Sequence, residues 1–359
     1  MPWLDAARGL GVIAMVFGHT LDGLLSPAAR ASPFIVEYWK ARGLTAPLFL
    51  MVAGWAVTLA VSRSPMRGWP MIRARLPRVA LLLTLGYALH LPGWDFQALL
   101  SGERAMWRQF LAFDALQVVA VGYLGALLVH ATGWSEARRA STFALLGTGA
   151  VVLGMCSLPV RAATLPGLAL VQAIAGTSPF PIVPWLAYFF FGAAGSLIAK
   201  DPRARWAAGL LSVGAYATAS FGWHGFGNMP PAHPLLVSFR VGAVLLLLAF
   251  LEVLPSRAAA VLARLAKYSL NVYVIHVPVV YGWFTLQGLS QRIGPRLAFH
   301  EAALMALAVL AAAIAAAAAM RRVAGAARGW LLFTRCSSTA HPGAQGACSE
   351  RVRLPDAAP

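Results

Sequence analysis

Apolar stretches long enough to cross a membrane recur along this chain from one end to the other. Since the hydrocarbon core of a bilayer is about 30 Å thick, a helix needs roughly 20 apolar residues to span it. Hydrophobic residues make up 59% of the 359 residues and charged residues only 11%, and a soluble globule of this length could not hide so much apolar surface. The sequence therefore predicts an all-α, polytopic integral membrane protein.

The hydropathy pattern predicts about ten transmembrane helices, with limits good to about 2–4 residues. Their expected ranges are 5–25, 44–62, 77–94, 113–132, 141–160, 182–199, 205–223, 235–255, 268–285 and 301–320. The proline-containing stretch 156–182 fits a re-entrant or interfacial piece, or an eleventh span. We expect residues 1–322 to form the helical bundle. Residues 323–359, polar and rich in Pro, Gly and Ala toward the end, would be a cytoplasmic and mostly disordered tail.

The distribution of charge predicts the orientation. A net charge of +17 would favour a nucleic-acid partner in a soluble protein. Here the Lys and Arg lie in short loops between apolar segments, so we expect the chain to be embedded in the lipid bilayer and to bind no nucleic acid. About twice as many of these Lys and Arg fall on the side of the membrane that holds the N-terminus as on the opposite side. This bias predicts that both termini lie in the cytoplasm. Tryptophans near span ends are typical of an aromatic belt: Trp39, Trp94, Trp107, Trp134, Trp206, Trp223 and Trp283.

The first span carries the sharpest polar pattern, LDAARGLGVIAMVFGHTLDG. Arg8 and His19 are separated by three helical turns plus about 20°, a rise of about 16 Å, so they share one face at different depths. Asp5 can pair with Arg8 from one turn away. Ionisable groups in lipid are costly, and histidine exchanges protons near neutral pH, which makes this face a candidate reactive site. The alternative is that Asp5 and Arg8 anchor the interface and His19 only bonds a neighbouring helix.

A basic cluster precedes the third span on the side of Arg8. Arg73, Arg75 and Arg78 lie within two helical turns there, and guanidinium groups suit phosphate. A charge run of this kind more often serves only to fix the topology. Because Arg8 lies on the same side, we expect four arginines to converge around one anionic group.

Further polar residues lie at membrane depth in the later spans. Each alone is more often a hydrogen bond between helices than a catalytic group, but together they predict a polar cavity that opens outward. They are His90, Asp114, Gln117, Arg240, Asn271 and His276. Cys156, Cys336 and Cys348 show no metal-like or redox-like spacing, and we expect no metal and no tightly bound cofactor.

At these residues the sequence resembles the transmembrane acyltransferase superfamily, which joins the acyltransferase 3 family to the heparan-alpha-glucosaminide N-acetyltransferase-like proteins. LDAARGLGVIAMVFGH resembles the opening helix, TAPLFLMVAGWAV is similar to the second helix, and RARLPRV resembles the second arginine motif. FDALQVVAVGYL and SPFPIVPWLAYFFFGAAGSLIA are closer to the N-acetyltransferase-like branch, and KYSLNVYVIHVPVV resembles a late helix of both. The resemblance covers roughly residues 1–320.

The resemblance implies a membrane-bound O- or N-acyltransferase. Its donor would be cytoplasmic acyl-CoA, by default acetyl-CoA, and its acceptor an extracytoplasmic carbohydrate, as a glycan or glycolipid. Together with the Arg- and Ala-rich composition, the resemblance implies a bacterial inner membrane. We expect His19 to act as general base, Arg8, Arg75 and Arg78 to bind the CoA phosphates, and Asp5 to hold Arg8.

Several alternatives stay open at this point. A covalent acyl-histidine is a second chemical route, and Asn271 and Arg240 are the candidates for oxyanion stabilisation. A transporter or flippase for a glycan, lipid or small anion would use the same buried polar groups as a pathway, without acyl chemistry. A structural or sensory membrane subunit would show neither flux nor transfer.

Overall fold

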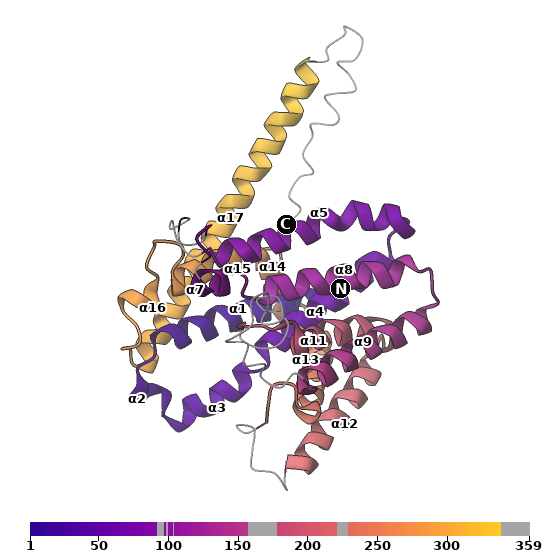
Figure 1. Ribbon diagram of the computed structural model, residues 1–359, viewed down its shortest axis with the longest axis horizontal. Coiled ribbons are helices and arrows are strands. Elements are labelled where there is room, and N and C mark those ends of the chain that lie inside the picture. Colours follow the sequence, from indigo (N-terminus) through magenta and orange to yellow (C-terminus); the bar gives the residue numbers. More distant parts are fainter. Residues whose placement is uncertain (92–96, 98–99, 103, 157–177, 221–228, 339–359) are drawn as a thin grey trace.

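The computed structural model describes residues 1–91, 97, 100–102, 104–156, 178–220 and 229–338, which contain helices and no strand (Figure 1). The longer helices are α1 (Pro2–Leu24), α4 (Thr45–Ser62), α5 (Gly68–Leu89), α8 (Ala115–Ala131), α9 (Glu136–Cys156), α11 (Ile182–Ile198), α12 (Pro202–Ser220), α13 (Pro234–Val253), α15 (Ser269–Tyr281) and α17 (Phe299–Ser338). The shorter ones are α2 (Pro27–Arg30), α3 (Pro33–Arg42), α7 (Arg104–Phe110), α14 (Ser256–Ala266) and α16 (Leu289–Arg292).

The prediction of a helical membrane protein is confirmed, and each of the ten predicted ranges overlaps one of the longer helices. By length and apolar composition, four helices in the described part of the chain can cross a membrane, or five if α14 and α15, bent by 63°, form one span. Two shorter apolar helices, α8 and α11, add to these. The count of about ten is therefore not confirmed.

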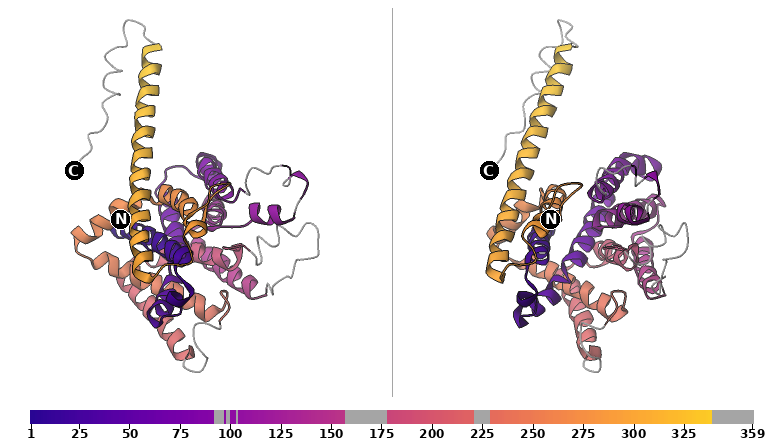
Figure 2. Two further views of the ribbon diagram at one scale, coloured as in Figure 1. Left: turned by 90° about the vertical axis from the view of Figure 1, so that its left-hand side faces the viewer. Right: turned by 60° about the vertical axis from the view of Figure 1, so that its left-hand side comes forward.

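Two boundaries differ from the prediction. Helix α5 begins at Gly68, ahead of the expected 77, and Pro77 lies inside it, so the arginine cluster is helical and not in a loop. Helix α17 continues to Ser338, and its C-terminal part projects away from the other helices (Figures 1 and 2), so residues 323–338 are helical. The rest of the predicted tail, and residues 157–177 of the unassigned stretch, lie outside the described residues.

Helix α1 is central to the bundle and packs against α4, α13, α14, α15 and α17. A second group, α4, α8, α9 and α11, packs beside it. Helices α4 and α11 approach each other closely, where Gly54 faces the backbone of Phe189 and Gly192 faces the backbone of Met51. Small residues at such crossings let helix backbones touch, which is how membrane helices gain packing energy where lipid supplies no hydrophobic drive.

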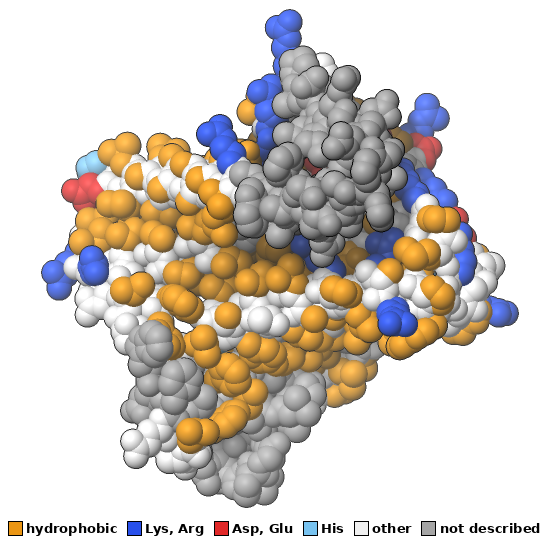
Figure 3. All heavy atoms as spheres, turned by 90° about the horizontal axis from the view of Figure 1, so that it is seen from above, with side chains coloured by type: hydrophobic (Ala, Val, Ile, Leu, Met, Phe, Trp, Pro, Cys, Tyr) orange, Lys and Arg blue, Asp and Glu red, His pale blue; other side chains and the backbone are white. Residues whose placement is uncertain are grey.

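The two ends of the bundle differ in what they hold. The start of α1 and the end of α4 lie at one end, called here the Arg8 end, and the end of α1 and the start of α4 lie at the other, the His19 end. Figure 3 shows hydrophobic side chains over the middle of one face, with most Lys and Arg around its edges. This distribution suits an apolar belt in lipid bordered by two aqueous surfaces.

We expect Gly192→Val to destabilise the protein by about 3 kcal/mol, the upper range for overpacking. The new Cβ would overlap the carbonyl group of Met51, which as backbone cannot rotate away. The matched control is Gly149→Val in α9, where a Cβ meets nothing within 4 Å. Thermal unfolding in detergent measures both variants, and equal midpoints would contradict this account of the α4–α11 crossing.

Candidate active site

Helix α1 lines two cavities along a single face. Ala7, Arg8 and Gly11 line a cavity at the Arg8 end, the inner cavity. Ala14, Met15, Gly18, His19 and Asp22 line a second one at the His19 end, the outer cavity. These positions recur every three or four residues, which is the spacing of one face of an α-helix. The predicted common face of Arg8 and His19 is therefore present.

The inner cavity is mostly apolar, with two arginines, Arg8 and Arg78, among its lining residues. It has a volume of about 240 Å³, and its polar side chains include Arg8, Arg78 and Ser269. Arg8 Nη1 lies 3.5 Å from Asp5 Oδ1, as predicted from their spacing, and Arg8 Nη2 donates to Ser269 Oγ at 3.4 Å. Most of the remaining lining is aliphatic or aromatic and comes from α4, α5, α8 and α15.

The inner cavity reaches deep into the bundle. Its lining includes Phe49, near the start of α4, and Leu116, near the start of α8, so it extends toward the His19 end. The outer cavity includes Ala46 from the same helix α4. Along α1 the lining of the inner cavity ends at Gly11 and that of the outer cavity begins three residues later, at Ala14. Along α4 the two linings are two residues apart, at Leu48 and Ala46.

The outer cavity is larger and more polar. It has a volume of about 450 Å³ and is bordered by three guanidinium groups but one carboxylate. Its functional lining residues are His19, Asp22, Arg30, Arg42, Arg240, Trp39, Trp185 and Phe180. Both Arg30 and Arg42 pair with Asp22, at 3.3 and 3.6 Å. The cavity therefore keeps an excess of positive charge next to His19.

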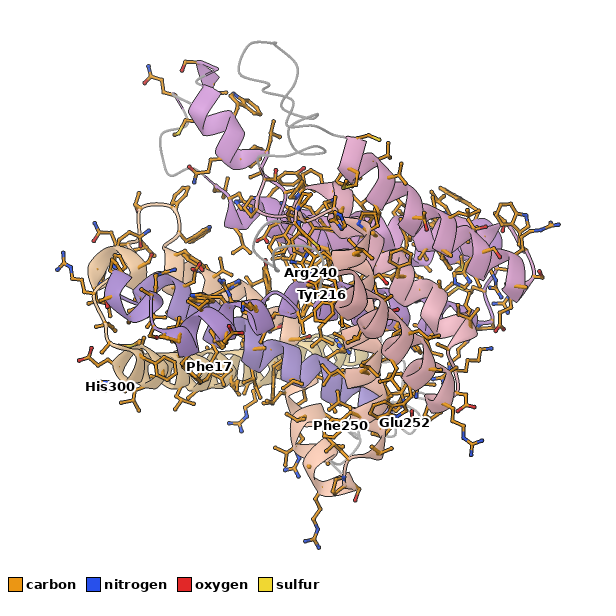
Figure 4. All side chains as sticks on the ribbon, turned by 90° about the horizontal axis from the view of Figure 1, so that it is seen from below. Phe17, Tyr216, Arg240, Phe250, Glu252 and His300 are labelled. Atoms are coloured by element: carbon orange, nitrogen blue, oxygen red, sulfur yellow. The ribbon has the colours of Figure 1, made fainter. Side chains whose placement is uncertain are left out.

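Two aromatic side chains accompany these arginines. The Arg42 guanidinium lies 4.8 Å from the centre of the Trp39 ring, and the Arg240 guanidinium 6.0 Å from that of Trp185. Arg240 also donates to the Tyr188 hydroxyl at 3.3 Å. Figure 4 shows Arg240 toward the middle of the bundle, at the opposite end of α13 from Glu252.

His19 is held by a second histidine from α15. His276 Nδ1 lies 2.7 Å from the carbonyl oxygen of Val272, which can only accept, so neutral His276 carries its proton on Nδ1. His276 Nε2 is then an acceptor, and His19 Nδ1, 2.9 Å away, donates to it. The hydrogen bonds thus assign the lone pair of His19 to Nε2. Among the residues that the structure describes, no side chain hydrogen-bonds this nitrogen.

A buried polar network continues behind His276. The ring of Tyr273 meets the His276 ring edge-on, with centroids 5.8 Å apart. The Tyr273 hydroxyl donates to Asp114 Oδ2 at 2.6 Å, and His90 Nε2 lies 3.7 Å from the same oxygen. Because Asp114 is buried, its negative charge acts on the histidine pair through a medium of low dielectric constant.

The predicted convergence of four arginines is wrong. Arg8 and Arg78 line the inner cavity, whereas Arg73 is exposed and Arg75 Nη2 donates to the carbonyl oxygen of Ala60 at 3.3 Å. Two steps along a helix turn the chain by about 200°, so Arg73 and Arg75 cannot share a face. The free carbonyls that end α4 attract the guanidinium of Arg75.

The predicted single polar cavity is also corrected. Asp114 and Gln117 form a capping box at the start of α8, in which the Asp114 amide donates to Gln117 Oε1 at 3.1 Å. A capping box satisfies amides that the first helical turn leaves free, which gives these two residues a structural role. Asn271 is partly buried and lines neither cavity, so of the two oxyanion candidates only Arg240 lies near His19.

Sequence reasoning missed several residues of the outer cavity. Arg30 and Arg42 look like ordinary residues of an outer loop, and Trp39 like part of the aromatic belt. A usable signal was present, because arginines on the predicted outer side run against the positive-inside rule and these two flank a tryptophan. Arg42 lies across Gly18, where a Cβ would come within 2.8 Å of Arg42 Nε, and it is thereby placed beside His19.

The comparison with protein families favours acyltransferase activity over the other function classes that the sequence leaves open. The acyltransferase domain profile of the acyltransferase 3 family matches residues 1–322. The chain belongs to the acyltransferase 3 family. The match includes every residue that lines the two cavities, and it identifies this acyltransferase 3 protein as a membrane acyltransferase in general terms. A search of curated proteins found no match.

The histidine pair of this acyltransferase 3 protein yields a matched test. His276→Gln keeps an acceptor for the His19 Nδ1 proton, whereas His276→Leu removes it. One net hydrogen bond is worth about 1–1.5 kcal/mol, so we expect the Leu variant to transfer acyl groups about tenfold more slowly and the Gln variant to keep most of the rate. Initial rates at saturating donor measure this. Equal rates for both variants and the wild type would show that His276 does not position His19.

Proposed function

We propose that this acyltransferase 3 protein moves an acyl group, by default acetyl, from acyl-CoA at the Arg8 end to a carbohydrate acceptor in the outer cavity. The observation that carries the proposal is the single face of α1, which lines an inner cavity at Arg8 and an outer cavity at His19. In this proposal the Arg8 end faces the cytoplasm of a bacterium and the His19 end lies outside the inner membrane.

The inner cavity suits the donor. Arg8 and Arg78 at its mouth offer guanidinium groups for the phosphates of CoA. The apolar shaft beyond them would hold the pantetheine arm and the acyl chain away from water. The rise along α1 from Arg8 to His19 is about 16 Å, and the donor would carry the thioester over this distance.

The chemistry would take place at His19 Nε2. This nitrogen accepts the proton of an acceptor hydroxyl or amine as that group attacks the thioester carbonyl. The carbon–sulfur bond breaks, and the proton passes from the imidazolium to the departing CoA thiolate. His276, Tyr273 and Asp114 support the transient positive charge on His19. The same nitrogen is the nucleophile if the acyl group passes through an acyl-histidine.

The outer cavity supplies partners for the other groups of the reaction. Arg42, which lies against Gly18, is a candidate for stabilising the oxyanion that forms on the thioester carbonyl, as is Arg240. The rings of Trp39 and Trp185 line the same space, and each combines a large apolar face with a polar edge. Such rings suit the apolar face of a sugar, which supports a glycan or glycolipid acceptor.

The test is transfer across a membrane. Proteoliposomes with labelled acetyl-CoA on the Arg8 side and a candidate glycan on the other should yield labelled glycan and free CoA. Passage of glycan or anion without loss of the thioester would indicate a transporter or flippase instead. Neither transfer nor transport would leave a structural or sensory subunit.

The donor site is tested by binding alone. We expect the double variant Arg8→Gln, Arg78→Gln to bind CoA about a hundredfold more weakly, since hydrogen bonds to charged groups are worth about 1.5–3 kcal/mol each and every 1.4 kcal/mol is tenfold. Arg73→Gln, an exposed arginine of the same helix, is the matched control and should bind normally. Unchanged affinity in the double variant would remove these two arginines from the donor site.

A further inference from the structure

A second cationic cluster lies at the Arg8 end, where α8 ends and α9 begins. His130, in the last turn of α8, is only 4% exposed. Arg139 of α9 lies beside it, with Arg139 Nη1 2.7 Å from His130 Nδ1. The charges of Arg139, Arg67 and Arg75 all act on His130. None of these four residues lines the inner cavity.

The hydrogen bonds of this cluster leave buried donors without acceptors. A guanidinium can only donate, so His130 Nδ1 accepts from Arg139 and neutral His130 carries its proton on Nε2. His130 Nε2, Arg139 Nε and Arg75 Nε are all buried without a hydrogen-bond partner among the described residues. A buried donor left unpaired is destabilising, so three in one neighbourhood call for an explanation.

The cluster also lacks a compensating carboxylate. No acidic side chain is among the charges that act on His130 in the described part of the chain. The nearest acidic residue in sequence to Arg139, Glu136, forms an ion pair with Lys200 instead. The guanidinium of Arg67 donates hydrogen bonds to the carbonyl oxygens of Ser64 and Met66. Unpaired donors and uncompensated positive charge together suit the binding of an anion.

We propose that Arg139, Arg75 and His130 bind a phosphate group, supplied by the ribose 3′-phosphate of the CoA donor or by the head group of an anionic lipid. Planar guanidinium groups match phosphate oxygens with paired donors, and His130 Nε2 adds a third. The CoA source rests on the proposed function. CoA carries its diphosphate and its 3′-phosphate on different parts of the molecule. Arg78 and Arg75 lie one turn apart on α5, so one helix would bind both phosphate groups.

The first arm of the test uses protein in nanodiscs of neutral phosphatidylcholine. We expect the wild type to bind CoA about tenfold more tightly than 3′-dephospho-CoA. Arg139→Gln should abolish this difference by weakening CoA binding alone, while Arg139→Lys keeps part of it. Arg138→Gln is the matched control, because Arg138 is the exposed neighbour of Arg139, and it should behave as wild type.

The second arm repeats the comparison in nanodiscs that contain phosphatidylglycerol. If the bound phosphate belongs to a lipid, this lipid raises the unfolding temperature of the wild type and of Arg138→Gln but not that of Arg139→Gln. Absence of an Arg139-dependent difference in both arms overturns the proposal. Failure of every form to bind CoA would refute the proposed donor, whereas the lipid arm would still decide whether this cluster binds phosphate.

Discussion

His19→Ala is expected to lower the rate of acyl transfer by about 10²–10⁴-fold, the range that general acid–base help typically contributes. His19 Nε2 is the nitrogen with a free lone pair in the hydrogen-bonded pair with His276, and His19 lines the outer cavity. Its replacement removes both the proton acceptor and any acyl-histidine. CoA binding should persist, because Arg8 and Arg78 lie in the other cavity.

His300→Ala is the control for this variant. His300 (labelled in Figure 4) is exposed at the start of α17, where Ala302 shares a packed cluster with Leu21 and Leu24 at the end of α1, and its loss should leave transfer unchanged. Rates are measured with labelled acyl-CoA under single-turnover conditions, so that slow product release cannot hide a change in the chemical step. Full activity in His19→Ala would refute its role as base or nucleophile.

Arg205→Leu is expected to destabilise the folded protein by about 3 kcal/mol, because it removes two hydrogen bonds from a charged donor, each worth about 1.5–3 kcal/mol. Arg205 is completely buried and forms an ion pair with Glu252. It also donates to the carbonyl oxygens of Ala199 and Lys200, at 2.8 and 2.9 Å, where α11 ends. Leucine would leave these acceptors without a donor.

Two aromatic rings add to the loss at this position. The Arg205 guanidinium lies 4.8 Å from the centre of the Trp3 ring and 5.9 Å from that of Trp55, an arrangement that stabilises a cation. Arg203→Leu, two residues away and exposed, removes the same charge without these contacts and should unfold at the wild-type temperature. If both variants unfold at one temperature, the buried arginine is not the link between α11, α12 and α13.

Much of the fold follows from periodicity that a single sequence displays. The Arg8–His19 spacing predicts one face of α1, and the structure lines both cavities with it. The number of transmembrane spans was less predictable, because a helix such as α5 combines arginines in its first half with an apolar second half. The predicted range 77–94 starts at Pro77, yet α5 begins nine residues earlier, at Gly68.

The detailed site depends on contacts between distant segments, which the sequence does not encode locally. Nothing near His19 in sequence indicates His276, which lies on another helix and determines which nitrogen of His19 is free. Arg75 and Arg78 belong to one motif, yet one points to the end of α4 and the other to the inner cavity. Arg42 reaches His19 only because Gly18 leaves room for its side chain.

Photo-crosslinking with an acyl-CoA that carries a diazirine on the acyl chain tests the path from Arg8 to His19 most directly. The proposed path predicts labelling of α1 between Gly11 and His19, competed by unlabelled CoA and weakened in the Arg8→Gln, Arg78→Gln variant. Labelling confined to residues at the Arg8 end, or to lipid-facing positions of α9 and α17, would contradict a donor that reaches His19.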